Sequence, residues 1–213
     1  MVLPQFRLQL VAYPGEQVNL HIFEPRYKQL MHDCEQKQLT FGIVAHLNNH
    51  LQKIGTEMIL ERIARRYQSG ELDIVAIGTQ RYRISRFYKK GKNKLYPTAS
   101  VAYINETEER ASLYDVQFIL ERLSDLYKFM NIDKPIPTDV KQVKAFDIAH
   151  QAGLNTDQEY HLLTLDSEAD RISYIRTHLE QLLPRVKEME LMRRKIQMNG
   201  HFRNVIPPDL GDL

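Results

Sequence analysis

The chain of 213 residues is 43% hydrophobic, 26% charged and nearly neutral, with a formal net charge of +2. This composition is typical of a globular protein with a buried core, which we expect to form two packed units, and it argues against a dedicated nucleic-acid binder with a strongly basic face. The single cysteine, Cys34, excludes an internal disulfide and favours a reducing compartment.

The first half of the chain, to about residue 104, has apolar residues mostly at every second position, which is typical of strands with one buried face. The expected strands are Phe6 to Leu10, Phe41 to Ala45, Ile59 to Tyr67, Leu72 to Ile77, Arg81 to Phe87 and Thr98 to Ile104. Turn residues separate them, as in Tyr13-Pro14-Gly15 and Gln68-Ser69-Gly70-Glu71, and Gly78 is expected to break a strand. Strands this short predict an antiparallel barrel or sandwich.

One helix interrupts the predicted sheet. Pro25 suits its first position, because an N–H there would have no helical partner. Tyr27, Leu30, Met31 and Cys34 follow with the spacing of one apolar stripe. We expect this helix to pack across an open end of the barrel and to hold Cys34 as a buried structural thiol rather than a reactive one.

From Ser112 the apolar period changes to 3.6, which indicates helices. Ser112 and Asp115 resemble a capping pair for the first of them. Its expected apolar stripe is Leu113, Val116, Leu120, Leu123, Tyr127 and Met130. A second helix is expected from Asp139 to a cap at Gly153, after a linker that contains Pro135 and Pro137.

A capping box of Thr156 and Glu159 predicts a short third helix, and Ser167 opens the last one. The expected stripe of the last helix is Ile172, Ile175, Leu179, Leu182, Val186, Met189 and Ile196. Unbroken to about Asn199, this helix would be roughly 45–50 Å long at ~1.5 Å per residue, but Pro184 should kink or interrupt it.

These patterns divide the chain into a β domain (1–104), a linker (105–111), a helical bundle (112–199) and a flexible tail (200–213). The linker carries Glu106, Glu108, Glu109 and Arg110, and we expect it to be solvated. The N-terminus has no cationic leader, and no apolar run approaches the ~20 residues that span a bilayer, so we expect a cytoplasmic protein without a membrane partner.

No catalytic constellation is evident, and we expect no enzyme activity, cofactor or metal. His46 and His50 have the spacing of a helical zinc pair, but Leu47-Asn48-Asn49 between them indicates a loop, where solvated histidines are expected. No serine has the flanking residues of a nucleophile elbow. The one Gly-Lys pair, Gly91-Lys92, lacks the frame of a phosphate-binding loop.

A basic loop is the best candidate for nucleic-acid binding. It contains Lys89, Lys90, Lys92 and Lys94, with Tyr88 and Tyr96 nearby. A solvated hairpin tip is the simpler interpretation of the same lysines. The mixed charges at the end of the last helix, including Arg193, Arg194 and Glu190, indicate a solvent-exposed face or a contact between helices.

The order of these features resembles the Lon protease N-terminal domain family. In the β domain the resemblance is carried by Pro14, Ile22, Phe23, Glu24, Pro25, Arg26, Tyr27, Gly42, Gly55, Gly78 and Arg81. Ile54-Gly55-Thr56 matches the family's turn between strands, and Phe146-Asp147-Ile148-Ala149, Leu162-Leu163 and Arg171 continue the likeness into the helices. These positions are expected to be mainly structural, with Ile22, Phe23 and Tyr27 in the core and Glu24 and Arg26 in a cap or ion pair.

The resemblance implies a PUA-like β pseudo-barrel followed by a helical bundle with a long last helix. It also implies polypeptide recognition, in a free-standing bacterial member without the AAA+ and Ser-Lys protease domains. The expected function is a non-catalytic adaptor or holdase in protein quality control. Its expected partners are unfolded or exposed-hydrophobic polypeptide segments and another protein of the proteolysis machinery. The alternatives are RNA binding through the barrel and a structural, self-associating protein.

Overall fold

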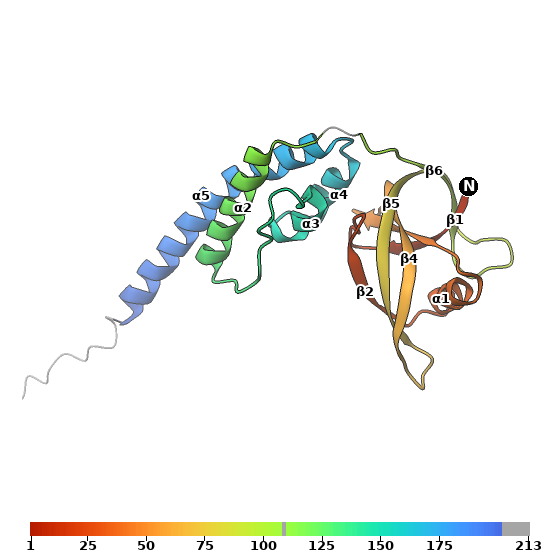
Figure 1. Ribbon diagram of the computed structural model, residues 1–213. Coiled ribbons are helices and arrows are strands. Elements are labelled where there is room, and N and C mark those ends of the chain that lie inside the picture. The colour runs from red at the N-terminus through yellow and green to blue at the C-terminus, as the bar shows by residue number, and fades with distance from the viewer. Residues whose placement is uncertain (108–109, 202–213) are drawn as a thin grey trace, which may run out of the picture.

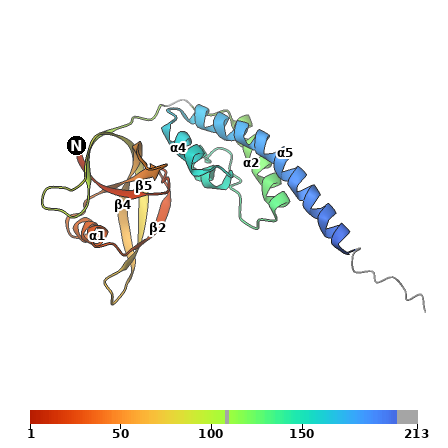
Figure 2. The same cartoon turned by 180° about the vertical axis from the view of Figure 1, so that it is seen from behind.

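A computed structural model describes residues 1–107 and 110–201, with the side chains of 198–201 left out. A β unit and a helical unit lie side by side, and the last helix projects away from both (Figures 1 and 2). The expected architecture of a β barrel with one added helix, followed by helices of which the last is the longest, is confirmed. The predicted tail falls outside the described residues from 202 onward.

The β unit is a closed six-stranded sheet in the order β2-β5-β4-β3-β1-β6, in which β5 also pairs with β6. Its strands are β1 (Val2–Leu8), β2 (Gln17–Ile22), β3 (Phe41–Leu47), β4 (His50–Arg66), β5 (Leu72–Tyr88) and β6 (Thr98–Tyr103). All neighbours are antiparallel except β1 and β3, which are parallel. The prediction of a purely antiparallel barrel therefore fails at this one pair.

Two glycines predicted to interrupt strands lie inside them. Gly55 is part of β4 and Gly78 is part of β5, so the expected turn at Ile54-Gly55-Thr56 is wrong. At Gly78 the strand passes against the segment after β1, and an added Cβ would lie 2.1 Å from the carbonyl oxygen of Tyr13. The Gly78 N–H instead donates to the Glu16 carbonyl at 2.9 Å. Glycine is needed here for close backbone approach, not for a break.

Tyr82 fills the barrel interior. Its side chain is fully buried, and its hydroxyl donates to the Gln5 side-chain oxygen at 2.7 Å. Gly42 and Gly55 flank the ring, where an added Cβ would come within 2.1 and 2.6 Å of the hydroxyl. Burial raises the pKa of Tyr82, so the hydroxyl remains a donor. The glycines of β3 and β4 therefore make room for a tyrosine from β5.

Helix α1 (Pro25–Lys37) begins with Pro25, as expected, and its predicted stripe is buried. Tyr27 packs on Phe6 of β1, with ring centroids 3.9 Å apart. The helix lies against the side of the barrel that faces away from the helical unit (Figures 1 and 2). Phe23 departs from the prediction of a core residue, because 59% of it is exposed.

The helical unit consists of α2 (Leu113–Met130), α3 (Ala145–Ile148), a 3₁₀ turn (Ala149–Gln151), α4 (Thr156–Thr164) and α5 (Glu168–His201). The helix expected from Asp139 begins only at Ala145. The cap of α4 is Asn155, which exchanges two 2.9 Å hydrogen bonds with Gln158, instead of the predicted Thr156. The side chain of Ser112 makes no capping bond to α2.

Helix α5 runs through Pro184 without interruption. Its 34 residues make it about 51 Å long. Its first half packs on α2 and buries Ile172, Ile175 and Leu179, whereas Met189 and Ile196 of the predicted stripe are exposed. The predicted stripe of α2 is likewise exposed at both ends, at Leu113 and Met130.

Candidate functional site

The β unit and the helical unit meet at a buried arginine. Arg81 of β5 is 0% exposed, and its guanidinium donates to the carbonyls of Leu163 and Leu165 at the C-terminal end of α4, each at 2.7 Å. It also pairs with the Glu106 carboxylate at 2.7 Å, and Glu106 pairs in turn with Arg171 of α5. Arg81 therefore ties the barrel to the helices.

Glu106 was predicted to be part of a solvated linker; its side chain is 45% exposed, and it also forms ion pairs with Arg81 and Arg171. Burial raises the pKa of its carboxyl, but the hydrogen bonds from Arg81 and Arg171 outweigh burial and hold the pKa below its ordinary value. The neighbouring Glu108 and Glu109 lie outside the described residues. This part of the segment between the units is fixed by charge pairing.

His150 connects the β unit and the helical unit at a second place. We call this contact, together with that of Arg81, the joint between the two units. His150 lies between Glu159 of α4, at 2.7 Å, and Glu16 of the β unit, at 3.2 Å. Burial lowers its pKa, but the two carboxylates outweigh burial and raise it to about 9. Beside it, Tyr13 stacks on Phe146 with ring centroids 4.9 Å apart. The two units are therefore held together here by ion pairs and ring stacking, and the His150 side chain remains 39% exposed.

The remaining family-signature residues at the start of α1 have mixed positions. Ile22 and Tyr27 are buried, and Phe23 is exposed. Glu24 occupies the cap position before Pro25 and pairs with Arg26 at 2.6 Å. Pro14 lies half-buried in the turn before Gly15, whose φ of 84° suits glycine. The exposed Phe23 is the member of this set that a partner could contact.

The basic loop is split between two roles. Lys89, Lys90 and Lys92 are exposed in the loop between β5 and β6. Lys94 instead pairs with Asp33 of α1 at 2.6 Å. Burial raises the pKa of Asp33, but bonds from Lys94, Tyr96 and Lys37 outweigh it and lower the pKa to about 2. The loop is therefore anchored to α1, and Lys94 is not available to a nucleic acid.

The two histidines of the spacing motif lie on either side of a hairpin. His46 is in β3 and His50 begins β4, with Asn48 and Asn49 in the turn at φ values of 50° and 63°. In the described parts of the chain, no group of three or more His, Cys, Asp and Glu side chains is placed to hold a metal. Within the same residues, no helix has the length and apolarity to cross a bilayer.

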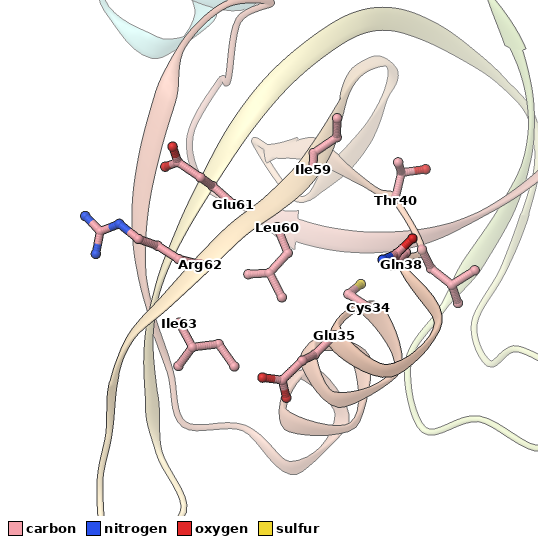
Figure 3. Close-up of a pocket in the computed structure, with 10 residues that line it drawn as sticks. Cys34, Glu35, Gln38, Thr40, Ile59, Leu60, Glu61, Arg62 and Ile63 are labelled. Atoms are coloured by element: carbon pink, nitrogen blue, oxygen red, sulfur yellow. The ribbon is translucent and has the colours of Figure 1, made fainter.

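A groove of about 490 Å³ lies between α1 and β4 and is lined in part by apolar side chains. Leu60 and Ile63 point from β4 toward α1, where Cys34 faces them (Figure 3). Leu39 and Ile59 line its mouth and are 39% and 48% exposed. An apolar floor that is open to solvent is the physical basis for binding apolar side chains.

The charged rim of the groove comes from both elements. Glu35 of α1 and Glu61 and Arg62 of β4 line it. A second cavity of about 250 Å³ shares Glu35 and Ile63 with the first and extends past Lys28 toward the β4–β5 hairpin. The two cavities thus adjoin each other along α1.

The sequence pattern missed this groove because of a β-bulge. Leu60 pairs with Ala76 and Arg62 with Val75, so Glu61 is an extra residue in β4. The bulge resets the alternation and brings Ile63 to the same side as Leu60, whereas the period-two prediction had grouped Ile63 with Ile59. The charged pair Glu61-Arg62 between Leu60 and Ile63 was the available signal.

A sequence model described as the ATP-dependent protease La (LON) substrate-binding domain matches residues 2–181. The chain belongs to this family. It is similar to a solved Lon N-terminal domain protein from Xanthomonas campestris, with 25% identity and a TM-score of 0.62, over 86% of this chain and 98% of that one. A comparison with curated protein sequences gives no match.

The N-terminal domain of Mycobacterium avium complex Lon protease has the same fold, with a TM-score of 0.65 at 14% identity. The alignment covers 84% of this chain and 98% of that one. Both Lon domains align over lengths that exceed the β unit alone. The order of the family-signature residues in the sequence was therefore sufficient to recognise the Lon family, although none of those in the β unit lines the groove.

Proposed function

We propose that this Lon-family chain is a non-catalytic polypeptide-recognition module that binds exposed apolar segments of unfolded proteins. Membership of a family described as a substrate-binding domain supports this function. The observation that carries it is the open groove between α1 and β4, which has an apolar floor and a charged rim. Such a module would act in protein quality control as a holdase, or as an adaptor that passes clients to another component of the proteolysis machinery.

The chemistry of Cys34 fits a binding role better than a catalytic one. Cys34 is 3% exposed, and burial raises the pKa of its thiol to about 12. Almost none of it is thiolate at neutral pH, and the thiolate is the nucleophilic form. Cys34 therefore contributes apolar surface to the groove.

Binding of a permanently unfolded protein tests the proposed function. Reduced, carboxymethylated lactalbumin, labelled with a fluorophore, should raise the fluorescence anisotropy on titration with the full chain. We expect a dissociation constant on the order of micromolar, because one apolar groove offers few anchors. Native lactalbumin is the matched control, since its apolar segments are buried.

Two negative results together would contradict the proposed function. If neither the anisotropy nor light scattering during client aggregation changes when the full chain is added, the recognition function is wrong. A pull-down with crosslinking from the source cells then separates the two forms of the proposal. An adaptor retains a component of the proteolysis machinery, and a holdase retains only clients.

A further inference from the structure

Strand β4 is longer than one of its partners. Its pairing with β3 ends where Met58 meets Phe41, whereas its pairing with β5 continues to Arg66. The stretch from Ile59 to Arg66 is therefore hydrogen-bonded to β5 on one edge only, and all of these residues lie in the described structure. An unpaired strand edge presents N–H and C=O groups that another chain can pair with.

The open edge borders the groove along its length. Ile59, Leu60 and Ile63 belong both to the unpaired stretch of β4 and to the lining of the groove. Helix α1 forms the opposite wall, from Lys28 to Gln38. That wall is about 15 Å long at ~1.5 Å per residue, which matches about five residues of extended chain at ~3.3 Å each.

The two bulges in this stretch set which chain can pair there. Bulges lie between Leu60 and Arg62 and between Ile63 and Arg65. Bulges and charges on an edge oppose indiscriminate pairing, because they twist the strand. Here the first bulge also turns Leu60 and Ile63 together into the groove (Figure 3). A guest strand must therefore fill the apolar floor as well as meet the backbone edge.

Charge distinguishes the two ends of the groove. At the hairpin end, Lys28, His32 and Arg66 line the second cavity. Arg66 pairs with Glu35, whereas the Lys28 ammonium donates to the Ser69 carbonyl at 3.3 Å and has no carboxylate partner in the described residues. This end is suited to an acidic group on the guest.

We propose that the groove takes its client as an added β-strand: an extended segment of about five residues pairs with the free edge of β4 at Ile59–Arg66, inserts apolar side chains toward Leu60 and Ile63, and places an acidic residue beside Lys28. The guest runs antiparallel to β4, in line with β3, so its acidic residue is N-terminal. This binding mode rests on the proposed function and names its substrate class.

A designed peptide tests the binding mode directly. The probe is a peptide of two aspartates followed by alternating valine and threonine, with fluorescein at its C-terminus, titrated with the full chain and followed by anisotropy. Its partner probe carries N-methyl groups on alternate backbone amides, which removes edge hydrogen bonds and keeps the side chains. Strand addition predicts about tenfold or greater weakening for the N-methylated probe, since several backbone hydrogen bonds to the edge are lost.

Two variants of the chain locate the site. Ile59→Glu places a charge at the mouth of the groove, at a side chain that is 48% exposed, and should weaken the probe about tenfold. Leu113→Glu is the matched control: Leu113 is 53% exposed on α2, away from the groove, and this variant should bind as the natural chain does. Lys28→Glu should weaken the acidic probe and strengthen one that begins with two lysines.

The outcomes separate the binding mode from the function. Equal affinity of the N-methylated and unmethylated probes overturns strand addition, and so does unchanged probe binding by Ile59→Glu. If carboxymethylated lactalbumin still binds in either case, the recognition function stands and uses another surface. If carboxymethylated lactalbumin does not bind to the natural chain, the proposed function itself is refuted.

Discussion

The two halves of strand β4 have opposite roles. The first half pairs with β3 throughout and with β5 from Ile54 to Met58, and the N–H groups of Lys53 and Ile54 donate to the Tyr160 hydroxyl of α4 at 3.2 Å. The second half pairs on one edge and borders an open groove. Where backbone and side chains are fully satisfied, the strand is structural. Where β4 continues past Phe41, the first residue of β3, the same strand has a free edge that is suited to recognition.

Substitutions in the joint between the two units, beside the first half of β4, should lower the free energy of unfolding most. Arg81→Ala removes the donor to the carbonyls of Leu163 and Leu165 and leaves Glu106 paired with Arg171 alone. We expect the free energy of unfolding to fall by about 3–4 kcal/mol, chiefly from the two unpaired carbonyls, measured by urea denaturation. Arg83→Ala, at an exposed position of the same strand, should change it by less than about 0.5 kcal/mol. Equal losses for the two variants would contradict a structural role of the joint.

Two adjacent residues at the boundary between the halves of β4 should differ most in how much their substitution destabilises the chain. Met58 is 0% exposed, so Met58→Ala should destabilise the chain by about 3 kcal/mol through lost burial and a cavity. Ile59, which follows it, is 48% exposed, and Ile59→Ala should cost less than about 1 kcal/mol. Thermal unfolding of both variants checks this. A similar loss for both would mean that the groove is covered in solution.

Close packing between β5 and the segment after β1 predicts a smaller loss. Gly78→Ala would place a Cβ 2.1 Å from the Tyr13 carbonyl oxygen, so the backbone must shift. We expect about 2 kcal/mol of destabilisation from overpacking, measured by urea denaturation. Unchanged stability would show that the two segments separate at no cost.

The contribution of the joint to folding stability should also depend on pH, and this is the smallest of the expected effects. The pKa of His150 is raised from 6.5 to about 9, so the folded state binds its proton more tightly than the unfolded state does. This contribution to stability is fully present below about pH 6.5 and is lost as the pH rises through about 9. Denaturation curves across that range should show the loss in the natural chain and a smaller one in His150→Gln. Parallel curves would refute the role of His150.

The fold was predictable from the sequence where local patterns decide it. Pro25 and the stripe from Tyr27 to Cys34 defined α1, and the change of period at Ser112 marked the helical unit. Prediction failed where tertiary contacts override local preference. Gly78 was expected to break a strand because its close neighbour, Tyr13, is distant in sequence, and Asp139 was expected to start a helix that begins only at Ala145.

The candidate site was harder to predict than the fold. The family-signature residues identified Arg81, but its partners Glu106, Leu163 and Leu165 come from elements that only the tertiary structure brings together. The groove escaped prediction because a bulge at Glu61 shifts the alternation, and because a free edge depends on where β3 begins. Neither property is encoded in a short local pattern.

The pairing of β1 with β6 has a consequence for how the chain is made. Val2 pairs with Ser100 and Pro4 with Thr98, so the first strand of the barrel to be synthesised pairs with the last strand of the barrel. Contacts between residues this far apart slow folding, because the loop must close before they form. The barrel therefore cannot close during early synthesis, and Val2–Leu8 stays an open strand until β6 has emerged. During that interval the chain is itself incompletely folded, like the chains that we propose it binds.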